Sequence, residues 1–171
     1  MDLILKKPNE TGATCPPTWL RSARRLSLKI KLGPSLIINQ PRSVLDAMDD
    51  WCKEQHARSG LVRSVLDSNI KLEEAENLVL DFVRTHTNPR VCPLAGNSVH
   101  VDRSFILKYM PRLAAHLHYR IVDVSSIKEI CRSWYPSEYK NAPKKKITHR
   151  AMDDIRESLV ELNYYRKSIF K

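Results

Sequence analysis

The hydrophobic and polar positions of this chain show no regular spacing until residue 26. Residues 1–25 lack both a helical and a strand period, and a Pro-Pro pair interrupts any regular element there. Over residues 26–32 apolar residues alternate with serine and lysine, which is the period of a half-buried strand. A Gly-Pro turn and a short apolar run at 36–38 follow. This pattern predicts a poorly ordered, divergent segment over 1–25 and then a β-hairpin.

Beyond residue 40 most apolar positions recur with the period of a helix. Ser43 and Ser125 each precede a periodic segment and are of a residue type that caps helices. Strands that alternate with helices indicate an α/β layer fold. Helices are predicted at 43–55, 59–66, 72–85, 102–113, 125–134 and 150–166, strands at 91–96 and 119–124, and a polar, basic loop at 136–146.

The same spacing places apolar residues on particular faces of these helices. Leu45, Met48 and Cys52 share one face of the first helix, and the helix after Asp102 carries Phe105, Ile106, Tyr109 and Leu113. The predicted core face of the next helix is Ile127, Ile130, Cys131 and Trp134, and Ile155, Leu159 and Leu162 of the last helix point inward.

The composition is that of one ordinary globular domain: 171 residues, 42% hydrophobic and 28% charged. No apolar run approaches the roughly 18 residues of a membrane-spanning helix, so no membrane span is expected. The net charge of +10 favours a polyanionic partner, above all a nucleic acid. Half of this excess lies within residues 1–34, so the rest of the chain suits a small nucleic-acid substrate better than a long duplex.

The four cysteines, Cys15, Cys52, Cys92 and Cys131, are widely spaced and form no Cys-x-x-Cys pair. This pattern indicates reduced thiols in an intracellular protein and argues against a zinc site. The N-terminus lacks the apolar segment of a secretory signal. Arginines within residues 21–25 give a weak likeness to a transit peptide, so we expect the mitochondrion, the cytoplasm or both.

Asp102 follows a predicted strand and the turn Gly96-Asn97-Ser98, and it stands at the start of a predicted helix. Functional residues of α/β sheets gather at the carboxyl ends of strands, which makes Asp102 a candidate site residue. Aspartate is also a favoured N-cap, so a purely structural role at the helix start is the alternative.

A second acidic position lies at the start of the last predicted helix. At about 100° per residue, Asp154 lies at the edge of the stripe that contains Ile155, whereas Asp153 faces solvent. Asp154 is therefore the better candidate for a partly enclosed metal site, with His149 just before the helix. In the alternative, both aspartates only stabilise the helix N-terminus and His149 is a loop residue.

Several short motifs stand in an order that resembles a known family. They are Met48-Asp49-Asp50-Trp51, Pro93-Leu94-Ala95-Gly96-Asn97-Ser98, Asp102-Arg103, Lys108-Tyr109-Met110-Pro111, His118-Tyr119-Arg120, Asp123-Val124-Ser125 and His149 to Ile155. With them the stretch from Gly33 to Lys171 resembles the oligoribonucleases, the animal form most of all. These belong to the DEDDh group of 3′-to-5′ exonucleases, whose ribonuclease-H-like fold has a mixed sheet flanked by helices.

The resemblance implies a site built on acidic residues. Asp102 and Asp154 look like two of the family's four acidic ligands, which hold two divalent ions, Mg²⁺ or Mn²⁺. Such ions activate a water and stabilise the leaving 3′ oxygen. His149 looks like the general base on that water, and Tyr119 is also placed among the catalytic residues. Asp123, inside a predicted strand, is expected to accept structural hydrogen bonds instead.

The resemblance also implies how short oligoribonucleotides bind. Trp51 looks like the aromatic residue that stacks on a base, and Ser98 looks like a contact near the scissile end. Tyr119, Arg120 and Ser125 resemble a cap for the 5′ phosphate, built partly across a homodimer interface. The alternatives are a core position for Trp51 and a strand-flanking position for Tyr119.

The family pattern breaks at the N-terminus. Its members begin with an apolar strand that ends in Asp-x-Glu and is followed by Met-Thr-Gly, and residues 1–25 hold no equivalent. We therefore expect an exonuclease domain over 26–171 whose first central strand is missing or replaced.

Three functions are weighed on this basis. The first is 3′-to-5′ hydrolysis of short oligoribonucleotides to mononucleotides, with an activity impaired by the loss of two acidic ligands. The alternative is an inactive chain that binds short RNA or pairs with an active oligoribonuclease. A DNA-binding protein driven by the basic N-terminus is a weaker hypothesis, because no groove-reading helix is evident.

Overall fold

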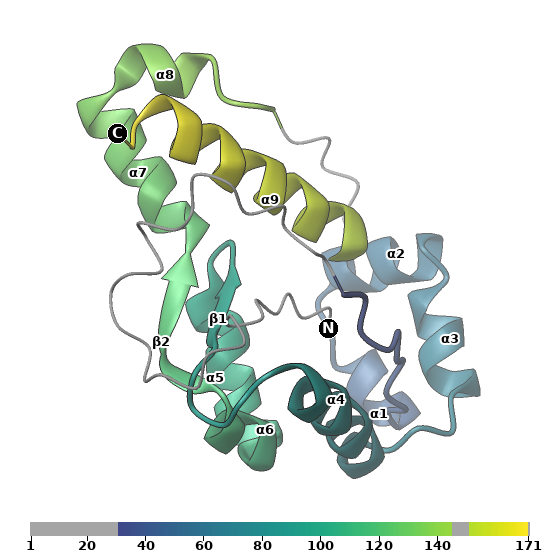
Figure 1. Ribbon diagram of the computed structural model, residues 1–171. Helices are drawn as coiled ribbons and strands as arrows, with labels where there is room; N and C mark the ends of the chain where they lie inside the picture. Colours follow the sequence, from purple (N-terminus) through teal and green to yellow (C-terminus); the bar gives the residue numbers. More distant parts are fainter. Residues whose placement is uncertain (1–30, 145–150, 171) are drawn as a thin grey trace.

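The computed structural model describes residues 31–144 and 151–170, with the side chains of residues 151–153 excepted. Helices surround a small sheet in this part of the chain (Figure 1). The elements are α1 (Arg42–Asp46), α2 (Asp50–Arg58), α3 (Leu61–Asp67), α4 (Leu72–His86), β1 (Pro93–Gly96), α5 (Val99–Tyr109), α6 (Pro111–His116), β2 (His118–Asp123), α7 (Val124–Trp134), α8 (Pro136–Lys140) and α9 (Ala151–Ser168).

β1 and β2 pair in parallel and form the two-stranded sheet of the described region. Parallel neighbours need a crossover connection, and α5 and α6 supply it. The register places Gly96 beside Asp123, so both strands end at the same edge of the sheet. The strands predicted at 91–96 and 119–124 are confirmed with slightly different ends, and the α/β class is confirmed with them.

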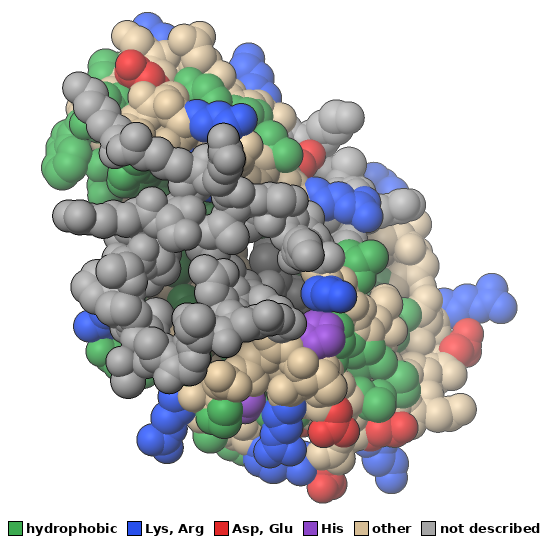
Figure 2. Space-filling view, in the orientation of Figure 1, with side chains coloured by type: hydrophobic (Ala, Val, Ile, Leu, Met, Phe, Trp, Pro, Cys, Tyr) green, Lys and Arg blue, Asp and Glu red, His purple; other side chains and the backbone are tan. Residues whose placement is uncertain are grey.

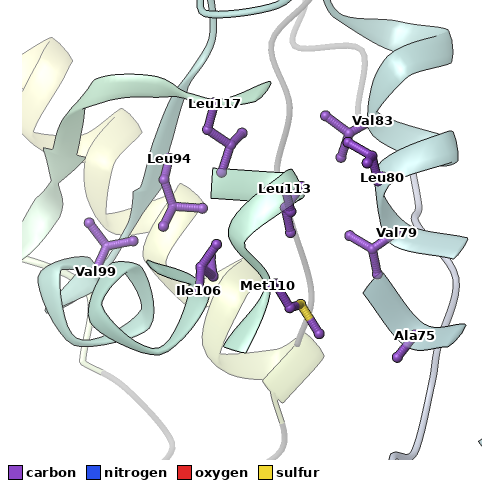
Figure 3. Close-up of a cluster of buried hydrophobic side chains, with 10 residues drawn as sticks. All are labelled: Ala75, Val79, Leu80, Val83, Leu94, Val99, Ile106, Met110, Leu113 and Leu117. Carbon is purple, nitrogen blue, oxygen red and sulfur yellow. The ribbon is translucent and has the colours of Figure 1, made fainter. Parts of the chain in front are cut away.

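One hydrophobic cluster joins α4, β1, α5 and α6, which together with β2 we call the body. α4 contributes a buried stripe along one face, as expected for an amphipathic helix. The buried side chains meet in the space between α4, α6 and β1 (Figure 3). They are Ala75, Val79, Leu80, Val83, Leu94, Val99, Ile106, Met110, Leu113 and Leu117.

The body also buries a carboxylate at the junction of two helices. Glu76 of α4 is 4% exposed and accepts hydrogen bonds from the backbone N–H groups of Arg112 and Leu113 at 2.7 and 3.1 Å. These N–H groups lie in the first turn of α6, where a helix offers them no internal partner. The guanidinium of Arg112 pairs with the same carboxylate at 2.9 Å. Glu76 therefore caps α6 from a neighbouring helix, and its buried charge is compensated.

A second cluster joins α7, α8 and α9 around Val124, Cys131 and Tyr165. Cys131 is buried as predicted. Ile130 and Trp134 of the same helix are 43% and 72% exposed, so the predicted inner face of α7 is partly wrong. The cluster is small, and Ile130 and Trp134 lie outside it.

The buried face of α9 also differs from the prediction. Leu159 and Leu162 are only half-buried, whereas Ser158, Glu161 and Tyr165 are buried. Buried polar groups are satisfied by hydrogen bonds, and those of Ser158 and Glu161 find partners at the end of β1. A hydrophobic period cannot identify such a face.

Residues 41–67 fold into α1, α2 and α3, which we call the arm, at the right of Figure 1. The single helix predicted at 43–55 is wrong. Asp49 caps α2 by accepting the N–H of Cys52 at 2.8 Å, and the chain changes direction between α1 and α2. None of the side chains in these three helices is buried, and the predicted apolar face of this segment is at most half-buried.

Hydrogen bonds from Asn39 close the base of the arm. The backbone N–H of Asn39 donates to the carbonyl of Ile70 at 2.8 Å, and the Asn39 side chain donates to the carbonyl of Val65 at 3.1 Å. The strand predicted at 36–38 is wrong. This segment pairs with no strand of the described residues, and the carbonyl of Ile37 accepts a hydrogen bond from the Ser68 hydroxyl instead. Most of the strand predicted at 26–32 lies outside the described residues.

Two helix starts in the C-terminal part differ from the prediction. The loop predicted at 136–146 contains α8, which begins with Pro136 at a position that suits proline. α7 is capped by Asp123 and not by Ser125, because the Asp123 carboxylate accepts the N–H of Ser125 at 2.9 Å. Among the described helices, none is long and apolar enough to cross a membrane.

Candidate functional site

At the carboxyl edge of the sheet, a turn after β1 brings three polar residues together: Ser98, Asp123 and Ser125. Ser98 ends this turn and precedes α5, with a φ of 50° that is uncommon outside glycine and often marks functional sites. Its N–H donates to Asp123 Oδ1 at 3.0 Å and to Ser125 Oγ at 2.9 Å. The hydroxyls of Ser98 and Ser125 lie 3.3 Å apart. The fold thus brings together two predicted substrate-binding residues.

Asp123 holds this turn in place. Its side chain is 10% exposed and accepts the N–H groups of Ser98 and Ser125, with His100 Nδ1 at 3.3 Å. Burial opposes ionisation of the carboxyl, but the hydrogen bonds from His100, Ser125 and Ser98 outweigh that cost and lower its pKa. These bonds confirm the structural role predicted for Asp123.

Asp102 lies in the first turn of α5. This helix begins at Val99 with Ser98 in the N-cap position, so the N-cap alternative for Asp102 is wrong. Its side chain is exposed and forms no hydrogen bond or ion pair with another residue of the described ranges. A carboxylate in this position, next to the carboxyl edge of the sheet, is available as a ligand.

Asp154 lies in the first turn of α9 and is half-buried, as predicted for the edge of the inner stripe. His149 and the side chain of Asp153 lie outside the described residues. Asp102 and Asp154 offer carboxylate oxygens, the kind of ligand that Mg²⁺ and Mn²⁺ take. Within the described ranges no group of three or more His, Cys, Asp or Glu residues could hold a metal ion. The described residues therefore fit such an ion in kind and form only part of a site.

Trp51 lies on α2 of the arm and is 60% exposed, so the alternative of a core position is wrong. An exposed indole ring presents a face on which a nucleic-acid base can stack. This candidate therefore stands on the arm, whereas the turn of Ser98 and Ser125 belongs to the body and the start of α7.

Tyr119 and Arg120 lie near the start of β2, and Tyr119 is 68% exposed. The ring of Tyr119 stacks on that of His118 at 4.5 Å, and the Arg120 guanidinium lies 5.4 Å from the Tyr119 ring. Tyr119 stands near the opposite end of the strand from Asp123, about 13 Å away at the usual rise per residue. Within one chain, the structure does not bring Tyr119 and Arg120 to the turn of Ser98 and Ser125.

An exposed apolar face runs along α5, which contacts β2. Val101, Phe105 and Tyr109 are 46%, 59% and 43% exposed. Residues spaced by four share one side of a helix, and Ile106 fills the core from the other side. The aromatic rings therefore form a surface near the strand that carries Tyr119.

Sequence reasoning missed Asn97, Ser158 and Glu161. The side-chain amide of Asn97 donates to Ser158 Oγ at 2.7 Å and to Glu161 Oε2 at 3.4 Å. Polar residues of an amphipathic helix are ordinarily assigned to its solvent face, which hid Ser158 and Glu161. The available signal was the place of Asn97 in the turn that follows a strand.

Comparison with known proteins gives a consistent result. A family model described as exonuclease matches residues 37–162. The chain is similar to the mitochondrial oligoribonuclease of Homo sapiens, with 60% identity over 81% of this chain and 59% of the relative. It is also similar to a probable oligoribonuclease of Dictyostelium discoideum, with 56% identity over 83% of this chain and 74% of the relative. The chain thus spans about three fifths of the length of the mammalian relatives it matches.

Proposed function

This chain belongs to the oligoribonuclease family of exonucleases, and from that premise we propose that it hydrolyses short oligoribonucleotides from the 3′ end to mononucleotides. The observation that carries the proposal is the 56% identity with a relative over 74% of that relative's length. The arrangement of the sheet supports it, because Ser98, Ser125 and Asp102 gather at the carboxyl edge, where α/β proteins place functional groups.

The proposal includes a divalent cation, Mg²⁺ or Mn²⁺, with Asp102 and Asp154 among its ligands. The availability of the Asp102 carboxylate and the half-buried position of Asp154 support these assignments. A pair of such ions, when bound, would activate water and stabilise the leaving oxygen. His149 is proposed as the general base, because an imidazole changes its protonation near neutral pH.

The chain's own polar groups would position the substrate. The adjacent hydroxyls of Ser98 and Ser125 are proposed to contact the oligonucleotide at its scissile end. Trp51 would stack on a base, a contact that tolerates any sequence. Arg120 would bind the 5′ phosphate, since a guanidinium can hold two phosphate oxygens at once. A site with a closed 5′ end would restrict the substrate to very short chains.

Tyr119 and Arg120 are proposed to serve the site of a second copy in a homodimer. Their separation from the turn of their own chain supports this arrangement, as does the exposed face of Phe105 and Tyr109 on α5. In a two-fold dimer the same patch is used by both subunits. The α5 face would then cover its equivalent and carry each β2 toward the partner's turn.

A mitochondrial location is proposed as well. The relatives from Homo sapiens, Bos taurus and Mus musculus are named mitochondrial oligoribonucleases. The arginines within residues 21–25 add weak support. Microscopy of cells that express the tagged chain tests this location against the cytoplasm.

A short RNA labelled at its 5′ end tests the activity. We expect Mn²⁺-dependent shortening by one nucleotide at a time, with the label kept on ever shorter products, and no shortening in EDTA. Asp102→Asn, which keeps the size of the side chain but removes its charge, should abolish the products. Cleavage at internal positions, or loss of the label as the first product, would contradict the proposal.

The inactive RNA-binding partner is the second candidate that the sequence raised. The similarity to enzymes named oligoribonuclease, across relatives of several kingdoms, supports the enzyme over this alternative. Figure 2 bears on the third candidate: among the coloured side chains of the visible face, Lys and Arg are interspersed with Asp and Glu.

A further inference from the structure

The side-chain amide of Asn97 lies where two parts of the molecule meet. Its Oδ1 accepts the Ser125 hydroxyl at 3.2 Å, and Ser125, in the first turn of α7, accepts the N–H of Ser98. Its Nδ2 donates in the other direction, to Ser158 Oγ at 2.7 Å and to Glu161 Oε2 at 3.4 Å. Asn97 therefore links the end of β1 to α9 through a single side chain.

The link continues toward the start of α9. The Ser158 hydroxyl donates to the backbone carbonyl of Asp154 at 2.7 Å, so the hydrogen bonds run from Asn97 through Ser158 to Asp154. Asp102 lies in the first turn of α5, directly after the turn that Asn97 helps to form. The two candidate ligands thus stand at the starts of two helices that Asn97 joins.

The acceptor side of this contact is firmly held. Glu161 is 3% exposed, its Oε1 accepts the Tyr165 hydroxyl at 3.1 Å, and Lys128 Nζ lies 3.6 Å from it. Tyr165 is itself fully buried in the cluster of α7 and α9. Because these partners are fixed, the Asn97 amide meets acceptors that do not move to follow it, and its position sets that of the turn relative to α9.

We propose that Asn97 is a positioning residue, which fixes α9 against the turn after β1 and so sets the distance between the carboxylates of Asp102 and Asp154. This inference rests on the proposed function, in which both carboxylates bind the divalent ion. Residues that orient metal ligands in this way commonly contribute roughly 10- to 100-fold to metal affinity or activity. Asn97 touches neither the ion nor the substrate in this account.

Two variants and one matched control test the role. Asn97→Ala removes the amide that donates to Ser158 and Glu161, and the loss of hydrogen bonds to buried groups is costly. Asn97→Asp keeps the shape of the side chain but turns an oxygen toward the Glu161 carboxylate, where like charges repel. Asn141→Asp makes the same chemical change at an exposed residue at the end of α8, outside the network.

Three measurements are made on the full chain at a temperature where every variant is folded. In both Asn97 variants, Mn²⁺ affinity measured by calorimetry should fall roughly 10- to 100-fold. Amide hydrogen exchange over residues 154–161 should become faster, because this part of α9 opens more readily. The kcat for a dinucleotide should fall with little change in KM, since substrate contacts remain. Asn141→Asp should behave as the wild type in all three.

The possible results separate the role of Asn97 from the proposed function. Unchanged Mn²⁺ affinity and unchanged exchange in both Asn97 variants would overturn the proposal, even if the wild type is active. A wild-type chain that binds Mn²⁺ without cleaving RNA would refute the proposed function, while affinity and exchange would still decide the role of Asn97. A wild-type chain that binds no Mn²⁺ would refute both.

Discussion

The arm and the body differ in how many of their side chains are buried. The body of α4, β1, α5, α6 and β2 encloses ten buried apolar residues, whereas α1, α2 and α3 of the arm contain no buried residue. The base of the arm is closed by hydrogen bonds from Asn39, whose N–H donates to Ile70 and whose side chain donates to Val65 of α3. Regions with few buried contacts open most easily, so we expect the arm to be the more adaptable of the two.

The candidate site is divided between these regions. The turn of Ser98 is held by Asp123 at the edge of the body's sheet, while Trp51 is carried by the arm. A reaction needs its catalytic groups fixed, but a stacking ring that accepts any base needs only to reach it. Under the proposed function, the body would hold the reacting groups and the arm would supply the sequence-tolerant contact.

The largest expected effect concerns stability in the body. Leu113→Ala removes a side chain that is 0% exposed and should lower the free energy of unfolding by about 2–5 kcal/mol. Leu61→Ala makes the same change in α3 of the arm, where the side chain is 41% exposed, and should cost no more than about 0.5 kcal/mol. Urea denaturation measures both. Equal losses would remove the distinction between the two regions.

The next effect depends on pH. The pKa of Asp123 is lowered in the folded state, so the carboxylate adds stability above its unfolded pKa of about 3.9 and loses that stability as pH falls through the folded pKa. Asp123→Asn should therefore cost about 1–3 kcal/mol at neutral pH, and its difference from the wild type should shrink below about pH 4.

Asp49 provides the control for this pH dependence. It caps α2 in the arm, and its hydrogen bond from the backbone N–H of Cys52 lowers its pKa too. Asparagine caps helices as well as aspartate does, and the arm is exposed. Asp49→Asn should therefore change the unfolding curve less than Asp123→Asn does across the same pH range. A larger pH-dependent loss at Asp49 than at Asp123 would be inconsistent with our comparison.

The smallest effect on stability should come from Trp51→Ala, within about 0.5 kcal/mol because the ring is exposed. Binding should respond more, with a loss of about 1–3 kcal/mol in affinity for a short oligoribonucleotide. Trp134→Ala removes another exposed tryptophan, at the end of α7, and should leave this affinity unchanged. Fluorescence anisotropy of a labelled trinucleotide measures both. Similar losses in the two variants would argue against a specific stacking role for Trp51.

The sequence predicted most of the elements, because their apolar periods reflect the cores that they build. α4, β1 and β2 follow the pattern closely, and Asp154 lies at the edge of the buried face as expected. The break before α2 was missed, since a single capping aspartate within a helical period decides it. The buried face of α9 was missed because it is polar, and its partner Asn97 comes from a distant part of the chain.

The residues of the candidate site could be predicted where the sequence matches a family motif, but their arrangement in space could not. Ser98 and Ser125 came from the resemblance, and the structure joins them across 27 positions of sequence. The separation of Tyr119 from that turn could not be read from a motif, since it depends on the direction of β2. The position of His149 and the metal-binding roles of Asp102 and Asp154 stay predictions.

Turnover of a dinucleotide tests the central claim most directly. The full chain is incubated with a diribonucleotide and Mn²⁺, and mononucleotides are separated by chromatography, with Asp102→Asn as the control. We predict mononucleotide products from the wild type and none from the variant or in EDTA. An intact dinucleotide after prolonged incubation with folded, Mn²⁺-saturated protein, or equal turnover by Asp102→Asn, would contradict the account.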